Sequence, residues 1–168
     1  MKKIVNFTDG ANIFVVLGQV GSGKTHLTLG HKGKKLVISF DGSYSTLEGH
    51  EDEMTVVEPE ISDYGNPDKL VDEIDDLAKG CDLVVFDNIS AVETSLVDAI
   101  TDGKLGNNTD GRAAYGVVQK LMAKFARWAI HFKGDVLFTL WSMVGEDGKE
   151  QPAMNAKAFN SVAGYAKL

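Results

Sequence analysis

The chain has 168 residues, of which 43% are hydrophobic and 24% charged, as is typical of one soluble globular domain. Its apolar runs are only as long as a strand, and no long apolar segment follows the lysines near its N-terminus, so we expect neither a membrane span nor a signal peptide. Because Cys81 is the only cysteine, no internal disulfide can form, and we expect a cytoplasmic protein.

The net charge of −7 is distributed unevenly. Residues 1–50 carry six basic and three acidic side chains, residues 51–110 carry three and seventeen, and residues 111–168 carry eight and four. Only the two flanking thirds could face a polyanion, because the middle third would repel one. This pattern does not indicate a constitutive nucleic-acid binder, although it leaves room for a DNA-binding strip.

Short apolar runs predict strands that are buried on both faces of a parallel sheet. These runs are residues 13–17, 36–40, 83–86 and 136–141, with a shorter strand expected at residues 54–57. Helices are expected from residue 24 to about 31, from Pro67 to a stop at Gly80, and from Arg112 to Phe132. Residues 101–111 are typical of an exposed loop, and residues 146–149 of a tight turn at a hairpin tip.

Strands that alternate with helices predict an α/β fold, with a mainly parallel sheet flanked by helices, in a single domain over residues 1–168. Residues 152–168 contain no evident closing element. We therefore expect either a truncated core or a final segment that docks on a neighbour.

A glycine-rich segment after the first strand matches the phosphate-loop pattern G-x-x-x-x-G-K-[ST] over residues 18–25. Its glycines let backbone N–H groups point at phosphate oxygens, and the following helix adds its positive dipole end. Lys24 would neutralise the β- and γ-phosphates and is expected to be largely exposed, while the Thr25 hydroxyl is a hard oxygen ligand for Mg²⁺. The expected nucleotide-binding residues are Gly18, Gln19, Val20, Gly21, Ser22, Gly23, Lys24, Thr25 and His26, with ATP or ADP and Mg²⁺ as cofactors.

Two acidic residues follow buried strands. Asp87 ends the strand at residues 83–86, where it would hold Mg²⁺ together with Thr25; the alternative is a solvated carboxylate at a strand end. Asp41 ends the strand after the phosphate-loop helix, where a carboxylate can activate the attacking water, and we expect it to be catalytic together with Lys24. The alternative for Asp41 is a turn former, because Asp-Gly is a common turn pair.

The order of these elements resembles the RecA/DnaB branch of P-loop ATPases over about residues 11–145. The second motif of that branch runs from apolar residues into Asp-Ser-hydrophobic-small-Ala, and residues 86–91 (FDNISA) are similar, with Asn88 replacing Ser. Its catalytic carboxylate, usually Glu, maps onto Asp41. The resemblance implies a RecA-like P-loop NTPase core, ATP hydrolysis, and a homo-oligomer with the nucleotide at the subunit interface.

Within this branch the chain most resembles small phage-encoded RecA-core ATPases, including Sak-type single-strand annealing proteins. The similarity lies in the length, in Gly-Ser after Asp41, and in a tail that runs from Lys157-Ala158-Phe159 to Gly164-Tyr165. It implies a role in phage-type recombination or annealing, with single-stranded DNA as partner and the host cytoplasm as location. RecA-like proteins also place a polar sensor after the long helix; here it is Thr139, Ser142 or absent, with Trp141 at the expected position.

Several cations could contact DNA or a neighbouring subunit. Residues 101–111 lie where RecA-like proteins carry a DNA-contacting loop, with Lys104 inside it and Arg112 just beyond it. Lys120, Lys124 and Arg127 share one helix face, which is either a solvated face or a DNA-facing stripe. Because the chain has only two arginines, the candidates for a cation supplied to a neighbour's site are Lys149, Lys157 and Lys167.

Three other functions remain open from the sequence. A helicase-like or helicase-loading motor would use the same fold. A small-molecule kinase would transfer the γ-phosphoryl group to a metabolite, but the chain lacks the Arg-rich lid typical of small kinases. A nucleotide-gated binding module with negligible turnover becomes attractive if Asp41 is misplaced.

Overall fold

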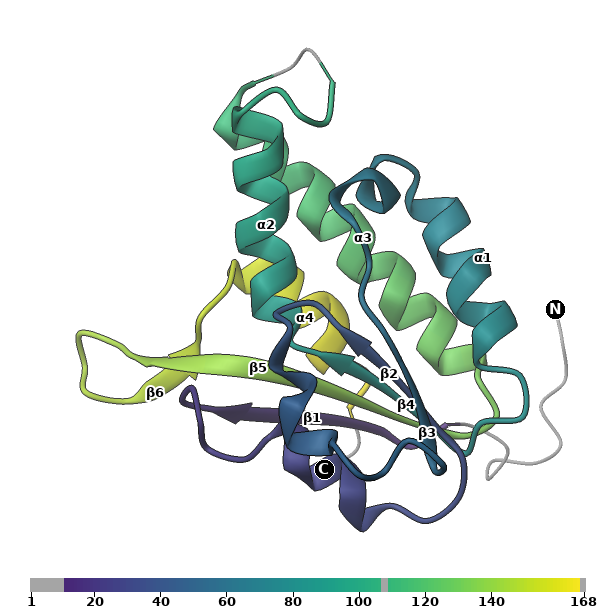
Figure 1. Cartoon of the computed structure of the whole chain (residues 1–168). Helices are drawn as coiled ribbons and strands as arrows, with labels where there is room; N and C mark the ends of the chain where they lie inside the picture. The colour runs from purple at the N-terminus through teal and green to yellow at the C-terminus, as the bar shows by residue number, and fades with distance from the viewer. Residues whose placement is uncertain (1–10, 107–108, 167–168) are drawn as a thin grey trace, which may run out of the picture.

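The structure, a computed structural model, describes residues 11–106 and 109–166, and its central element is a twisted sheet (Figure 1). Among these residues five strands run parallel in the order β1-β5-β4-β2-β3, and β6 pairs antiparallel with β5. The strand bounds are Ile13–Gly18 (β1), Lys35–Ser39 (β2), Met54–Val57 (β3), Leu83–Asp87 (β4), Asp135–Val144 (β5) and Glu150–Pro152 (β6). The strands predicted from apolar runs and the hairpin at residues 146–149 are confirmed.

Four α-helices and three short 3-10 helices connect these strands within the part of the chain that the structure describes. The α-helices are Pro67–Leu77 (α1), Ile89–Thr101 (α2), Gly111–His131 (α3) and Ala156–Ala163 (α4), and the 3-10 helices are Thr25–Gly30 (η1), Ser43–Leu47 (η2) and Ile61–Gly65 (η3). Each α-helix begins after an Asn or Asp whose side chain accepts a backbone N–H of the first turn. These capping residues are Asn66, Asn88, Asp110 and Asn155.

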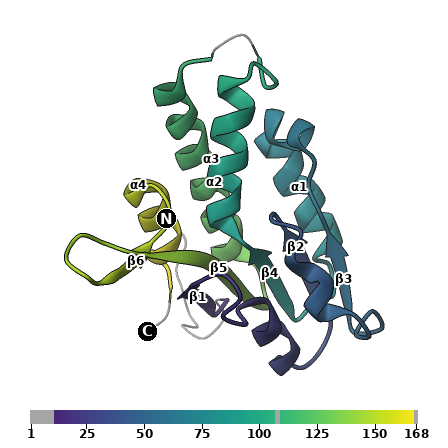
Figure 2. The same ribbon diagram turned by 60° about the vertical axis from the view of Figure 1, so that its left-hand side comes forward.

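The two faces of the sheet are covered unequally. In both views α1, α2 and α3 stand on one side, and the large buried cluster there also includes Ala158 and Val162 of α4 (Figures 1 and 2). Phe86 is at the centre of this cluster, with its ring 4.7 Å from that of Phe138 and 4.9 Å from that of Phe125. Burying one such side chain contributes about 1.5–3 kcal/mol, so this layer supplies most of the hydrophobic stabilisation.

The opposite face carries a much smaller cluster. Alternate strand residues such as Val37, Val85 and Leu137 point to this side and pack against Leu47 of η2 and Leu29 of η1. Because side chains alternate along a strand, one continuous apolar run supplies both layers. The second layer therefore consists of two 3-10 helices rather than of long α-helices.

The observed helices differ from the prediction in several places. The helix expected over residues 24–31 is the six-residue 3-10 helix η1, whose β-branched Thr25 and Thr28 and terminal Gly30 do not favour a longer α-helix. The helices α2 and α4 were not predicted, and α4 closes the segment in which no element was expected. None of the described helices is long and apolar enough to cross a membrane.

Candidate nucleotide-binding site

The phosphate-loop segment lies between the end of β1 and the start of η1, as the sequence predicts. Gly21 and Gly23 have φ angles of 76° and 84°, a left-handed backbone that glycine adopts without steric cost. The N–H of Ser22 donates to the Gln19 carbonyl at 3.2 Å and closes the turn. The loop thus has the curled backbone that can direct N–H groups at an anion.

Lys24 is buried, with 8% of its surface exposed, so the expectation that it would be largely exposed is wrong. Its ammonium group donates to the carbonyls of Gly18 and Gln19, each at 2.8 Å. These carbonyls hold the side chain against its own loop, and burial lowers the pKa of Lys24 although Asp87 and Asp41 oppose that change. The amine is positioned inside the loop, where a phosphate would bind.

Asp87 lies at the centre of the site and is 2% exposed. Thr25 Oγ1 donates to Asp87 Oδ2 at 2.5 Å, and Thr139 Oγ1 donates to Asp87 Oδ1. Burial raises the pKa of Asp87, while the bonds from the two threonines and the charge of Lys24 act in the opposite direction. Asp87 is therefore a buried carboxylate facing the phosphate loop, and not a solvated strand end.

The sheet order explains how Thr139 reaches Asp87. The strand β5 lies between β1 and β4, so its side chains stand between the phosphate loop and the Asp87 strand. Of the two polar residues considered as a sensor, Thr139 contacts Asp87, whereas the buried Ser142 Oγ has no hydrogen-bond partner in the described regions. Trp141 lines the cleft, and its backbone N–H donates to Ser90 Oγ at 3.1 Å.

Asp41 follows β2, the neighbour of β4, and its half-buried side chain lines the same cleft as Lys24 and Asp87. Its Oδ1 accepts the N–H of Ser43 at 2.9 Å, which is the local turn geometry of an Asp-Gly pair. Asp41 also acts electrostatically on Lys24 and Asp87. Both interpretations of this residue are compatible with the structure, because one carboxylate oxygen fixes the turn and the other remains for the cleft.

The cleft has a volume of about 290 Å³. It brings together every expected binding residue from Val20 to His26 with Asp41 and Asp87. Gly18 and Gln19 instead line a groove on the other side of the loop. The sequence reasoning missed Asn88 and the residues that η2 contributes to this cleft, which are Ser43, Ser45 and Thr46.

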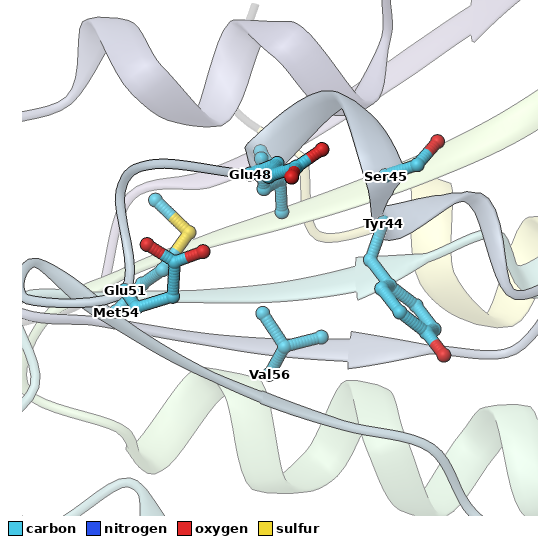
Figure 3. Close-up of a pocket in the computed structure, with 7 residues that line it drawn as sticks. Tyr44, Ser45, Glu48, Glu51, Met54 and Val56 are labelled. Atoms are coloured by element: carbon cyan, nitrogen blue, oxygen red, sulfur yellow. The ribbon is translucent and has the colours of Figure 1, made fainter.

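A second groove adjoins the cleft and shares Ser45 with it. It has a volume of about 470 Å³ between η2 and the edge strand β3, with Leu47, Met54 and Val56 as apolar lining. Figure 3 shows the Tyr44 ring on one side of this groove and the carboxylates of Glu48 and Glu51 on another. The two hollows together form a continuous surface along η2.

Some of the cations expected to contact DNA are paired with carboxylates in the structure, and others are exposed. Lys104 pairs with Asp102 at 3.0 Å, and Lys124 pairs with Asp68 of α1. Arg112, Lys120 and Arg127 are exposed. The loop expected over residues 101–111 is confirmed at residues 102–106 and 109–110, whereas Thr101 ends α2, Gly111 begins α3, and residues 107–108 lie outside the described residues.

Two of the three lysines considered for a neighbour's site are described and exposed. Lys149 lies at the tip of the β5–β6 hairpin, which projects from the sheet (Figure 2). Lys157 lies in the first turn of α4. Lys167 falls outside the described residues.

The residues present fit a magnesium nucleotide. The Thr25 hydroxyl and the Asp87 carboxylate are hard oxygen donors of the kind that Mg²⁺ prefers. Asn88 Nδ2 is buried beside them and has no hydrogen-bond partner in the part of the chain described, so a donor remains for a ligand oxygen. The loop backbone and Lys24 supply the complementary groups for phosphate.

These observations define a P-loop nucleotide-binding domain of the ATPase class, with the predicted α/β fold of a mainly parallel sheet flanked by helices. The chain belongs to the AAA domain family, whose model matches residues 11–167. No curated protein matches the sequence.

Among solved structures, the chain is similar to a KaiC-like protein from the hyperthermophilic archaeon Pyrococcus horikoshii OT3. The two are 12% identical, with a TM-score of 0.49. The similarity covers 86% of this chain and 66% of that chain, so this chain spans just under two thirds of the length of that structure.

Proposed function

We propose that this protein binds ATP with Mg²⁺ and hydrolyses it. The observation that carries the proposal is the convergence of the phosphate-loop Thr25 and of Thr139 on the buried carboxylate of Asp87. A surface carboxylate would need no such arrangement. Three elements meet here at the carboxyl edge of the parallel strands, where ligands of open α/β sheets bind.

Each residue has a distinct role in this proposal. The loop N–H groups and Lys24 hold the β- and γ-phosphates, once the Lys24 ammonium exchanges its bonds to the Gly18 and Gln19 carbonyls for phosphate oxygens. Thr25 and Asp87 would hold Mg²⁺, which supplies charge neutralisation to the transferred phosphoryl group. Asp41 would accept a proton from the attacking water at the carboxylate oxygen that Ser43 does not occupy.

The groove beside the cleft can accommodate the nucleoside part of ATP. A cleft of about 290 Å³ suits the phosphates, and the adjoining groove offers an aromatic ring, an apolar lining and two carboxylates. A base against Tyr44 would bury apolar surface, and Glu48 could accept an exocyclic amine. Replacing Tyr44 with Ala should weaken ATP binding and leave inorganic triphosphate binding unchanged.

We further propose that the ATPase acts on single-stranded nucleic acid, in phage-type recombination or annealing, as a homo-oligomer. This part is supported by the resemblance of residues 18–25 and 86–91 to RecA-like proteins and by the exposed cations of α3. A helicase-like or helicase-loading motor would use the same site and the same partner. A metabolite kinase or a binding module without turnover would show no stimulation by DNA.

The experiment is an ATPase assay with and without Mg²⁺ and with and without single-stranded DNA. We expect turnover that requires Mg²⁺ and rises on DNA, with no turnover in Lys24→Ala. ATP binding without any turnover would instead favour the alternative function of a nucleotide-gated binding module. If folded protein bound no nucleotide, the P-loop interpretation would be wrong.

A further inference from the structure

A groove on the surface between α3 and α4 is separate from the nucleotide cleft. It has a volume of about 420 Å³ and shares no lining residue with the cleft or with the groove beside η2. Arg127 and Ile130 of α3 form one wall, and Asn160 and Ser161 of α4 form the other, with Tyr165 just beyond the end of α4. Nothing in the proposed ATPase chemistry uses this groove.

The two walls belong to stretches of the sequence that contain no acidic residue. The chain has 24 Asp and Glu residues, yet residues 111–134 and 151–168 contain none. These stretches carry Arg112, Lys120, Lys124, Arg127, Lys133, Lys157 and Lys167. A protein with a net charge of −7 therefore presents a locally cationic surface here, which attracts a polyanion that the middle third of the chain repels.

The spacing of the cations places three of them along the groove. Lys120 and Arg127 share one face of α3 with the groove residue Ile130, at positions i, i+7 and i+10. Lys157 lies one turn before Ser161 on α4. The side chains of Lys120, Arg127 and Lys157 are exposed and form no ion pair among the described residues.

Lys124, on the same face of α3 as Lys120 and Arg127, pairs with Asp68 of α1. Trp128 Nε1 donates to Asp75 at 2.9 Å. At the start of α4, the Glu93 carboxylate of α2 accepts the N–H of Asn155 at 2.8 Å. Of the three cations on this face, Lys124 is compensated by Asp68, whereas Lys120 and Arg127 form no ion pair among the described residues.

An aromatic ring accompanies these charges. Tyr165 is 54% exposed, although it lines the groove beside Arg127. A half-exposed ring in the same groove as a guanidinium group can serve as a stacking platform for a nucleobase, and Asn160 adds an amide that can hydrogen-bond a base edge. Duplex DNA offers no free base face to such a ring, because its bases are already stacked on each other.

We propose that the groove between α3 and α4 binds single-stranded nucleic acid, with a base stacked on Tyr165 and the phosphates paired with Lys120, Arg127 and Lys157. The proposal rests on the nucleic-acid part of the proposed function and names its binding site. In this proposal the nucleic-acid strand lies between α3 and α4 and not on the loop at residues 101–111. The lysine of that loop, Lys104, is already paired with Asp102.

The test measures fluorescence anisotropy of a labelled oligo-dT strand titrated with the full chain. Tyr165→Ala should weaken binding at least about fivefold, the lower end of the cost of one lost base–aromatic stack, while Tyr165→Phe should bind as wild type because it retains the ring. Arg127→Gln should weaken binding and reduce the slope of log affinity against log salt by about 0.7 for each lost phosphate contact. Lys79→Ala, which removes an exposed cation of the segment after α1, should have no effect.

Four outcomes would overturn the proposal. Two of them are oligo-dT binding that is unchanged in both Tyr165→Ala and Arg127→Gln, and a loss of affinity that is equal in Tyr165→Phe and Tyr165→Ala. The other two are duplex DNA that binds as tightly as single-stranded DNA, and a loss of affinity that is confined to the loop-side variant Arg112→Gln. ATP affinity and the melting temperature are measured for each variant, so misfolding is recognised separately. A protein that hydrolyses ATP and binds no oligo-dT would contradict the groove and leave the proposed hydrolysis standing.

Discussion

The hydroxyl of Thr25 lies 2.5 Å from a carboxylate oxygen of Asp87, although 62 residues separate them in the sequence. This contact joins the phosphate loop to the strand β4 directly. A metal ion that both residues hold would have to replace their mutual hydrogen bond. The metal and the protein therefore compete for the same oxygens, and the contact should respond to Mg²⁺.

We expect Asp87→Asn to weaken Mg²⁺-dependent nucleotide binding more than binding without Mg²⁺, because the substitution removes the negative charge that faces the metal. Titrations of ATP with and without Mg²⁺ measure this difference. Asp76→Asn, at an exposed carboxylate that pairs with Lys79, is the matched control. An equal loss in both titrations would place Asp87 outside the metal site.

The same substitution should stabilise the protein without ligand at neutral pH. Burial raises the pKa of Asp87 in the folded state above its ordinary value of about 4. Asp87 therefore contributes stability below its unfolded pKa, and this contribution is lost as the pH rises through the folded pKa. The melting temperature of Asp87→Asn should exceed that of wild type at pH 7, by about 2–4 °C for each kcal/mol, and the difference should shrink as the pH falls toward 4. A difference that is constant with pH would show that the charge of Asp87 is not responsible.

We expect Lys24→Ala to lose at least about tenfold in nucleotide affinity, because a hydrogen bond to a charged group contributes about 1.5–3 kcal/mol. Its fold should persist, since the Lys24 ammonium contacts only loop carbonyls. Isothermal titration with ATP and circular dichroism measure the two quantities. Lys32→Ala is the control at an exposed lysine. Wild-type affinity in folded Lys24→Ala would refute the assigned role.

Asp41→Asn should leave ATP binding intact and slow turnover by about 10²–10⁴, the usual range for general-base catalysis. The substitution is clean because an Asn side-chain oxygen can still accept the Ser43 N–H that Asp41 accepts. Single-turnover hydrolysis with saturating ATP measures the step. A wild-type rate would place the general base elsewhere.

Activity per subunit should rise steeply with protein concentration or on single-stranded DNA, if a neighbour supplies a cation to the transferred phosphoryl group. Lys149 is the best placed candidate, because it is 83% exposed at the tip of a projecting hairpin. Lys149→Ala should abolish the rise and leave ATP affinity nearly unchanged. Specific activity that stays flat over a wide concentration range, with and without DNA, would argue against a shared site.

The sequence predicts those parts of the site in which each position requires a particular residue type for one physical reason. The spacing from Gly18 to Thr25 predicts the phosphate loop. Asp87 follows a strand that is predicted to be buried because its residues are all apolar. The same runs predict the parallel strands, because continuous apolar sequence suits a sheet covered on both faces.

The features that the sequence leaves open or does not predict depend on partners distant in the sequence. Thr139 becomes a partner of Asp87 only because β5 lies between β1 and β4. Lys24 is buried because the loop folds its own carbonyls onto the ammonium group, which no local pattern indicates. The helix α2 could have been found, since Asn88 is a capping residue and Ile89, Val92, Leu96 and Ile100 follow at helical spacing.

The unequal covering of the sheet has a dynamic consequence. Two of the elements that line the nucleotide cleft, η1 and η2, belong to the thin layer, whose few buried contacts and short hydrogen-bonded turns are features of a low-stability foldon. This layer can open while the packed layer of α1, α2 and α3 remains folded. Amide protons of residues 25–30 and 43–47 should then exchange fastest among the helical residues and gain the most protection when ATP binds. The free energy of ATP binding would in this way order the layer of the molecule that is least stable without ligand.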